Sequence, residues 1–255
     1  MSVPNIRTKR KIAKALRRHA RSISGWARWS QKTTKMHAYQ ANAFLLGVML
    51  DRSVLADRAW EAAQWICNAL IDGEDIASLW RRLRDMEPVR LRGFLRYGYG
   101  GNALHRHYKT FARLLPAAAE HLLENYDGDP RRIWNDQRDI AEVRRRLEVI
   151  PTIGPALARM AVLILARDHG LLGGKKARAQ LDVKPDIHVQ RVFQRTGLIP
   201  KGASPSDVVD VARDLAPDFP AALDAPAWEI GRQWCRPSRP MCSECPLGEI
   251  CPRLG

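Results

Sequence analysis

Apolar residues recur along most of the chain at intervals of three and four positions, a spacing that brings side chains onto one face of an α-helix. The alternating apolar–polar pattern of a β-strand does not persist beyond four residues, and no internal repeat is visible. One helix is expected to begin after Asp186. The other expected helices cover 41–50, 57–70, 76–86, 105–125, 139–149, 156–167, 205–215 and 226–234. The sequence therefore predicts an all-α fold.

Two features between these helices depart from the regular pattern. The segment 91–102 mixes glycine, arginine and aromatic residues. Its glycines permit close approach of a partner, so Tyr97 and Tyr99 are candidates to line a pocket or wedge into a stack of bases. A plain glycine-rich turn is the alternative. His105 and His107 lie beside Lys109, and we expect them to face solvent or phosphate rather than a metal.

Charge is distributed unevenly along the chain. The 42 Lys and Arg residues outnumber the 27 Asp and Glu, for a net charge of +15, and residues 1–40 hold eleven basic side chains and no acidic one. Such a surplus favours a polyanionic partner, most often nucleic acid. A basic amphipathic helix over 9–21 on a membrane surface and a disordered solubilising tail over 1–20 are the alternatives, but the apolar face of that helix is thin.

Membrane insertion and secretion are not expected. No run of 18 apolar residues exists, and the N-terminus lacks the apolar segment of a secretory signal. The C-terminus instead holds Cys235, Cys242, Cys245 and Cys251 with the spacing C-x6-C-x2-C-x5-C. Four thiolates can bind a tetrahedral zinc or a [4Fe–4S] cluster, and the presence of only one short C-x2-C pair favours the cluster over zinc. Disulfides are the alternative, but nothing in the sequence indicates secretion. Unoxidised thiolates indicate a reducing cytoplasm.

A turn rich in proline and glycine, 150–155, separates two expected helices. Pro155 at the first helical position needs no hydrogen-bond acceptor. The backbone amides of Ile153, Gly154 and the helix start at Ala156 are then available to a phosphate, whose charge the helix dipole favours. This is the helix-hairpin-helix pattern. Downstream, Asp186 precedes a helix as a good N-cap, and capping alone would explain its presence.

The order of these three signals resembles the endonuclease III branch of the helix-hairpin-helix DNA glycosylases, over roughly Ala41 to the C-terminus. The resemblance implies two helical lobes with DNA across the groove between them. A six-helix barrel lobe would cover 42–168. The [4Fe–4S] cluster lobe would cover 169–255, joined by the basic N-terminal segment 1–41.

The resemblance also implies roles for individual residues. Asp186 matches the catalytic aspartate, which stabilises positive charge on the sugar or activates water, and His188 is a supporting residue. Ala156 stands where lyase-competent members carry a nucleophilic lysine, so we expect hydrolysis with little strand cleavage, unless Lys184 acts as a displaced amine. Thr152 replaces the usual first glycine of the hairpin.

The remaining expected DNA contacts come from surface loops. Arg52 and Ser53 stand at the position that fills the gap left by a flipped base. The loop before Asp186 is longer than usual in the family, and its lysines add contacts. Basic residues of the cysteine loop would face phosphates. The expected contacts are Lys175 and Lys176 in the loop before Asp186, and Arg236 and Arg239 in the cysteine loop.

Together these expectations describe a base-excision repair enzyme. It would act as a cytoplasmic, nucleoid-associated monomer on double-stranded DNA that contains a damaged or mismatched base, without a membrane partner. A relative that binds lesions or single strands, with weak catalysis and a structural cluster, is the alternative. The identity of the excised base does not follow from the sequence.

Overall fold

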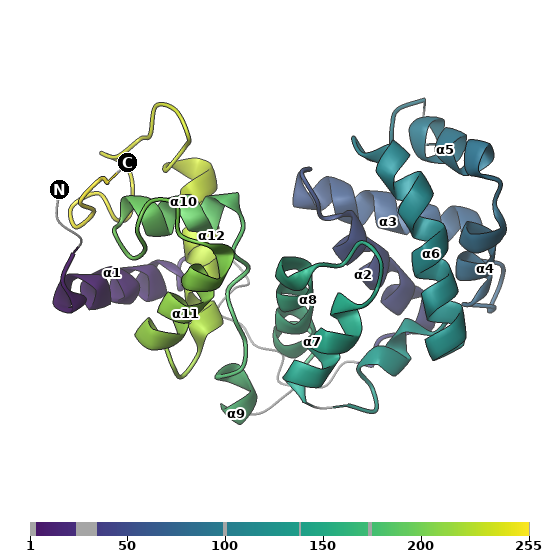
Figure 1. Cartoon of the computed structure of the whole chain (residues 1–255), viewed down its shortest axis with the longest axis horizontal. Coiled ribbons are helices and arrows are strands. Elements are labelled where there is room, and N and C mark those ends of the chain that lie inside the picture. The colour runs from purple at the N-terminus through teal and green to yellow at the C-terminus, as the bar shows by residue number, and fades with distance from the viewer. Residues whose placement is uncertain (1–3, 24–34, 99–100, 138, 173–174, 255) are drawn as a thin grey trace. The chain divides into compact units, whose positions relative to one another are not determined.

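The structure is a computed structural model that describes residues 4–23, 35–98, 101–137, 139–172 and 175–254. In these ranges the regular elements are helices, and one isolated bridge joins Asp72 and Asp75. The chain divides into two compact units, unit 1 (Met1–Lys32 and Val162–Gly255) and unit 2 (Thr33–Ala161). Figure 1 shows the helices of both units. No helix in the described ranges is both long and apolar enough to span a bilayer.

Unit 2 is built around large apolar side chains. Phe44 stacks on Trp60 with ring centroids 6.0 Å apart and meets Trp134 edge-on at 5.6 Å. The buried Trp80 donates from Nε1 to Asn42 Oδ1 at 2.7 Å, so its polar atom is satisfied inside the core. Its elements are α2 (Ala38–Leu50), α3 (Ala56–Leu70), α4 (Ser78–Asp85), α5 (Pro88–Tyr97), α6 (Tyr108–Tyr126), η1 (Pro130–Ile133), α7 (Ile140–Glu148) and the start of α8 (Pro155–Arg167).

Unit 1 joins the N-terminal helix to the C-terminal third of the chain. Ile12, Ala13 and Leu16 of α1 (Ile6–His19) are buried in the core of the unit, and α1 packs against three later elements. Those elements are α11 (Pro205–Leu215), η2 (Pro220–Leu223) and α12 (Asp224–Gln233). The unit also holds the end of α8, α9 (Lys175–Arg178) and α10 (Ile187–Arg195), followed by the cysteine loop, 235–251.

The all-α prediction is confirmed. Within the described ranges, some segments for which a turn, a loop or a disordered tail was considered are helical instead. The segment 91–102 does not begin as a turn, because α5 runs through it to Tyr97. Pro88 at the first helical position starts this helix, a signal that the apolar pattern alone does not carry. The short helix α9 lies inside the predicted loop 170–181, and α1 is an anchored helix rather than a disordered tail.

Candidate catalytic site and nucleic-acid interface

The hairpin turn between α7 and α8 has one engaged amide and one open amide. The N–H of Ile153 donates to the carbonyl of Ile150 at 3.0 Å, so this amide is engaged within the turn, and its role as a phosphate donor stays a prediction. Gly154 is exposed, and its N–H has no acceptor among the described residues. Ala156 follows in the first turn of α8, where helix amides lack internal partners. The turn therefore offers Gly154 and the first turn of α8 to an anion.

Thr152 holds this turn in a conformation that favours glycine. Its φ is 86°, in the left-handed region, and its buried Oγ1 has no hydrogen-bond partner among the described residues. A β-branched residue is strained in this region. The turn thus keeps a glycine-like backbone despite the loss of glycine.

We expect Thr152→Gly to raise the free energy of unfolding by about 1 kcal/mol, since relief of the left-handed strain outweighs the added entropy of the unfolded chain. Thermal denaturation measures the change. Thr110→Gly, the same substitution within α6, is the control and should lose a few tenths of a kcal/mol. An equal loss in both variants would show that Thr152 is not strained.

Asp186 caps α10 with one carboxylate oxygen and leaves the other available. Oδ1 accepts the backbone N–H groups of His188 at 2.8 Å and Val189 at 2.9 Å. Oδ2 has no hydrogen-bond partner among the described residues, and the side chain is half-buried. The cap therefore fixes the direction of the carboxylate without using all of its acceptor capacity. Asp186 is well placed to face a positively charged or protic group.

A second carboxylate supports the segment that leads to Asp186. Asp224, in the first turn of α12, accepts the N–H of Lys184 at 2.5 Å through Oδ1. Burial raises the pKa of Asp224 to about 7; the Lys184 N–H opposes this rise, and the charge of Asp186 adds to it. Sequence reasoning missed this residue, because it lies 40 positions from its partner.

A carboxyl whose pKa is raised by folding stabilises the native state only while it is protonated. Between pH 3.8, the usual pKa of an aspartate, and about pH 7, Asp224 keeps its proton in the native protein but has lost it in the unfolded chain. Stability from Asp224 is therefore complete below pH 4 and lost as pH rises through 7. Urea denaturation should show that Asp224→Asn removes about 2 kcal/mol of the stability difference between pH 5 and pH 8.

The comparison of two pH profiles isolates this carboxyl. His105, whose pKa burial lowers to about 4, contributes equally to wild type and variant. Asp207→Asn is the matched control, because hydrogen bonds from Ser204 lower the pKa of Asp207 and keep it ionised from pH 5 to 8. A profile for Asp224→Asn that is parallel to wild type would contradict the prediction.

Helix α10 also holds the cysteine loop. Arg191 donates from Nε to the Cys235 carbonyl at 2.6 Å and from Nη2 to the Gly231 carbonyl at 2.7 Å. Arg195 donates to the carbonyls of Arg236 at 2.6 Å and Pro237 at 2.9 Å. These arginines were not assigned a role from the sequence. One helix thus carries Asp186 at its start and the anchors of the cysteine loop along its length.

His188 of α10 packs closely against Gly231 of α12. A side chain at Gly231 would come within 2.8 Å of the His188 Cβ, so glycine is required there. His188 Nδ1 faces Arg191 Nη2 at 2.9 Å, and burial lowers the pKa of His188 below its usual value. The neutral ring is then the acceptor, and His188 braces α10 within unit 1.

The four cysteines of the loop are reduced and half-buried. Burial raises the pKa of Cys245 and Cys251, and the negative charge of the Cys235 and Cys242 thiolates raises each further. Gly248 has no room for a side chain, because a Cβ would lie 2.3 Å from the Cys242 carbonyl. Within the described ranges, however, no three His, Cys, Asp or Glu side chains are close enough to bind a metal ion.

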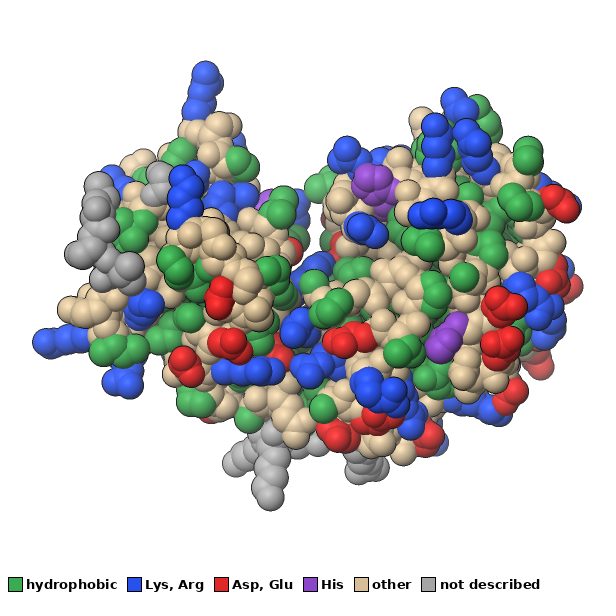
Figure 2. All heavy atoms as spheres, in the orientation of Figure 1, with side chains coloured by type: hydrophobic (Ala, Val, Ile, Leu, Met, Phe, Trp, Pro, Cys, Tyr) green, Lys and Arg blue, Asp and Glu red, His purple; other side chains and the backbone are tan. Residues whose placement is uncertain are grey.

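The basic residues of the loop are exposed. Arg236 donates from Nε to the Gln233 carbonyl at 3.1 Å, and Arg239 has a left-handed backbone with φ of 53°. Basic side chains are spread over the visible faces of both units in Figure 2. Lys175 and Lys176 open α9.

The loop after α2 is tied to a buried histidine. Arg52 and Ser53 are exposed, and Ser53 has a φ of 60°. The carbonyl of Leu50 accepts the Arg52 N–H at 2.7 Å and faces His105 Nε2 at 3.1 Å. His105 is only 2% exposed, so the prediction that it faces solvent or phosphate is wrong. It packs edge-on against Phe111 instead, which the sequence pattern did not indicate.

Tyr97 ends α5 with its side chain 56% exposed. The Arg96 guanidinium lies over its ring, 4.8 Å from the centroid, which orients the ring and adds positive charge beside it. Tyr99, the second predicted aromatic contact, lies outside the described residues.

Comparisons with known proteins place this architecture. Endonuclease III complexed with DNA gives TM-scores of 0.64 for a trapped covalent intermediate and 0.65 for a non-covalent complex, each at 17% identity, with 96% of this chain covered and 96% and 95% of the others. A thermostable thymine-DNA glycosylase gives 0.59 at 15% identity, with 96% of both chains covered. The fold is therefore that of the helix-hairpin-helix DNA glycosylases.

The sequence agrees with this class. Endonuclease III of Synechocystis sp. (strain ATCC 27184 / PCC 6803 / Kazusa) is 28% identical over 153 residues, 57% of this chain and 57% of the cyanobacterial protein. The matched stretch thus spans little more than half the length of that relative. No family model matches the chain. The chain is thus similar to endonuclease III in sequence and in fold.

Proposed function

We propose that this chain is a DNA N-glycosylase of the endonuclease III type, which hydrolyses the bond between a damaged or mismatched base and its sugar. Asp186 carries the proposal. Its Oδ1 is fixed by two backbone amides while Oδ2 has no partner among the described residues. The fold and the likeness to endonuclease III support the same reaction. We further propose that it acts as a monomer in the cytoplasm, at the nucleoid.

The reaction needs a carboxylate and water. As the bond from sugar C1′ to the base breaks, its electron pair leaves with the base and positive charge develops on the sugar. The Asp186 carboxylate stabilises this charge and takes a proton from the water that adds to C1′. The methyl group of Ala156 cannot form a Schiff base, so the product is an intact strand with an abasic site.

Contacts with DNA come from several loops in this proposal. The amides of Gly154 and the first turn of α8 bind a phosphate, and Arg52 or Ser53 fills the gap left by the flipped base. Tyr97 and Tyr99 contact bases. The basic side chains of α9 and the cysteine loop bind further phosphates: Lys175, Lys176, Arg236 and Arg239.

We propose that Cys235, Cys242, Cys245 and Cys251 bind a [4Fe–4S] cluster. The spacing of the four thiols within 17 residues, the packing of Cys235, Cys245 and Cys251 against the core of unit 1 and the close approach at Gly248 support it. Arg195 Nη1 lies 3.6 Å from Cys235 Sγ and is placed to offset thiolate charge. When bound, the cluster holds the loop by four covalent anchors.

Elemental analysis of anaerobically purified protein tests the cluster. We expect iron and acid-labile sulfide in equal amounts, with a visible charge-transfer band, and loss of both in Cys242→Ser. Cys67→Ala is the control, because this buried thiol lies in α3 and should leave the iron content unchanged. Stoichiometric zinc without sulfide would replace the cluster by a tetrahedral zinc site with four cysteine ligands.

A panel of duplexes tests the activity. The duplexes carry uracil, an oxidised pyrimidine, an alkylated purine or a mismatched adenine. Base release is measured with and without hot alkali. We expect at least one base to be released, with strand breaks only after alkali and no adduct trapped by borohydride. A trapped adduct would assign an amine nucleophile such as Lys184. Tight binding with no base released would make the chain a lesion-binding relative.

A further inference from the structure

Helix α1 carries a row of arginine and lysine side chains and is itself anchored in unit 1. Its opposite face is buried, with Ile12 and Leu16 at 0% exposure and Ala13 at 3%. Asn5 caps the helix through Oδ1, which accepts the Thr8 N–H at 3.0 Å, and Lys9 Nζ donates to the Leu198 carbonyl at 2.9 Å. The basic side chains therefore project from a rigid scaffold.

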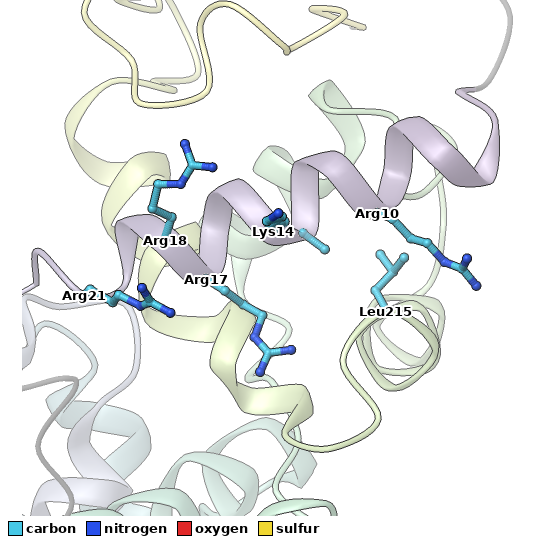
Figure 3. Close-up of a pocket in the computed structure, with 7 residues that line it drawn as sticks. Arg10, Lys14, Arg17, Arg18, Arg21 and Leu215 are labelled. Carbon is cyan, nitrogen blue, oxygen red and sulfur yellow. The ribbon is translucent and has the colours of Figure 1, made fainter.

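Five of these side chains line one groove. The groove has a volume of about 310 Å³ and is lined by Arg10, Ala13, Lys14, Arg17, Arg18, Arg21 and Leu215. Figure 3 shows the basic side chains extending outward from α1, with Leu215 of α11 beside Arg10. Repeats of three and four residues place them along one side of the helix.

The positive charge of the groove is largely uncompensated. Arg17 pairs with Asp218, Nη2 to Oδ2, at 2.7 Å. The other four basic side chains are exposed and have no acidic partner among the described residues. Closely spaced like charges raise the local potential and favour an anion with several charges.

We propose that this groove binds the phosphodiester backbone of duplex DNA, as a surface additional to the residues assigned to base release. From Arg10 to Arg18 the helix rises by about 12 Å, and the same length of duplex carries about three to four phosphates on each strand. A row of cations over that distance matches the charge repeat of a nucleic-acid strand. None of the groove residues belongs to the hairpin, to α10 or to the cysteine loop.

The packing of α1 argues against a membrane as the partner. Interfacial helices insert an exposed apolar face into lipid. Here that face is covered by the core of unit 1, and Ile6, 56% exposed, is the exposed large apolar side chain of the helix. The groove thus offers charge without an insertable surface, which suits a hydrated phosphate backbone.

Charge-matched variants on the same helix test the proposal. Lys14→Gln/Arg18→Gln removes two charges from the groove, and Arg7→Gln/Lys11→Gln removes two exposed charges outside it. Binding of the full-length protein to an undamaged duplex is measured from 50 to 300 mM salt. We expect the groove variant to lose about two units from the slope of log affinity against log salt, and the control to lose well under one.

The outcomes separate the proposal from its rivals and from the proposed base release. Circular dichroism confirms that both variants keep their helices. If both variants lose the same amount of slope, DNA binding depends on the overall charge of the helix and not on the groove. If the groove variant keeps the wild-type slope, the groove does not bind DNA. Phosphatidylserine vesicles that bind wild type but not the groove variant, with DNA binding unchanged, would assign the groove to membranes. Because the duplex is undamaged, none of these results depends on base release.

Discussion

Asp186→Asn is expected to slow base release about 10²–10⁴-fold while duplex binding is kept. Asparagine has the same shape and is an equally good N-cap, so its Oδ1 still accepts the amides of His188 and Val189. Only the negative charge is lost. Single-turnover kinetics on the best substrate of the duplex panel measure the chemical step, and gel-shift titration measures binding.

Asp139→Asn is the matched control for this experiment. Asp139 caps α7 in the same way, accepting the Ala141 N–H at 3.0 Å, and has no assigned role in base release. We expect it to leave the rate within about twofold, since an Asp-to-Asn change at an N-cap costs little. Full base release by Asp186→Asn would leave Asp186 a capping residue only. Loss of DNA binding together with activity would assign it to binding.

The predictions that succeeded rest on signals local in the sequence. Helical periodicity indicated the all-α class, and α8 and α10 begin next to Pro155 and Asp186, the residues that mark their starts. Apolar residues at intervals of three and four occur wherever a helix packs on a core, so this pattern can be recognised without knowing which element the helix packs against. The helix that begins at Pro88 was missed because its glycine and arginines interrupt the apolar stripe.

The predictions that failed required partners distant in the sequence. His105 resembles a surface histidine beside Arg106, His107 and Lys109, and only the Leu50 carbonyl, 55 positions away, makes its burial acceptable. Asp224 and Lys184 are 40 positions apart, as are Arg195 and the Cys235 sulfur. Such pairs form only after helices pack, so a single sequence shows two ordinary charged residues.

The ion pair between Arg213 and the buried carboxylate of Asp182 should have the largest effect on stability. Arg213 of α11 donates to Asp182 through Nε at 2.8 Å and Nη2 at 2.9 Å. The Asp182 side chain is 1% exposed, and it lies four residues before Asp186. Arg213→Met removes the bidentate partner of a buried carboxylate, so we expect a loss of about 3 kcal/mol in the free energy of unfolding.

An exposed pair in the same unit provides the control. Arg17 also makes two hydrogen bonds to its partner Asp218, from Nη1 at 3.1 Å and Nη2 at 2.7 Å. The two arginines are similarly exposed, 43% for Arg17 and 48% for Arg213, but Asp218 is 63% exposed whereas Asp182 is 1% exposed. Arg17→Met should therefore cost less than about 1 kcal/mol in urea denaturation. Double-mutant cycles with Asp182→Asn and Asp218→Asn remove the packing contribution of each methionine. Equal coupling energies in the two cycles would show that burial of Asp182 does not decide the strength of its pair. A larger coupling at Asp182 would instead show that charge pairing inside unit 1 fixes the chain just ahead of Asp186.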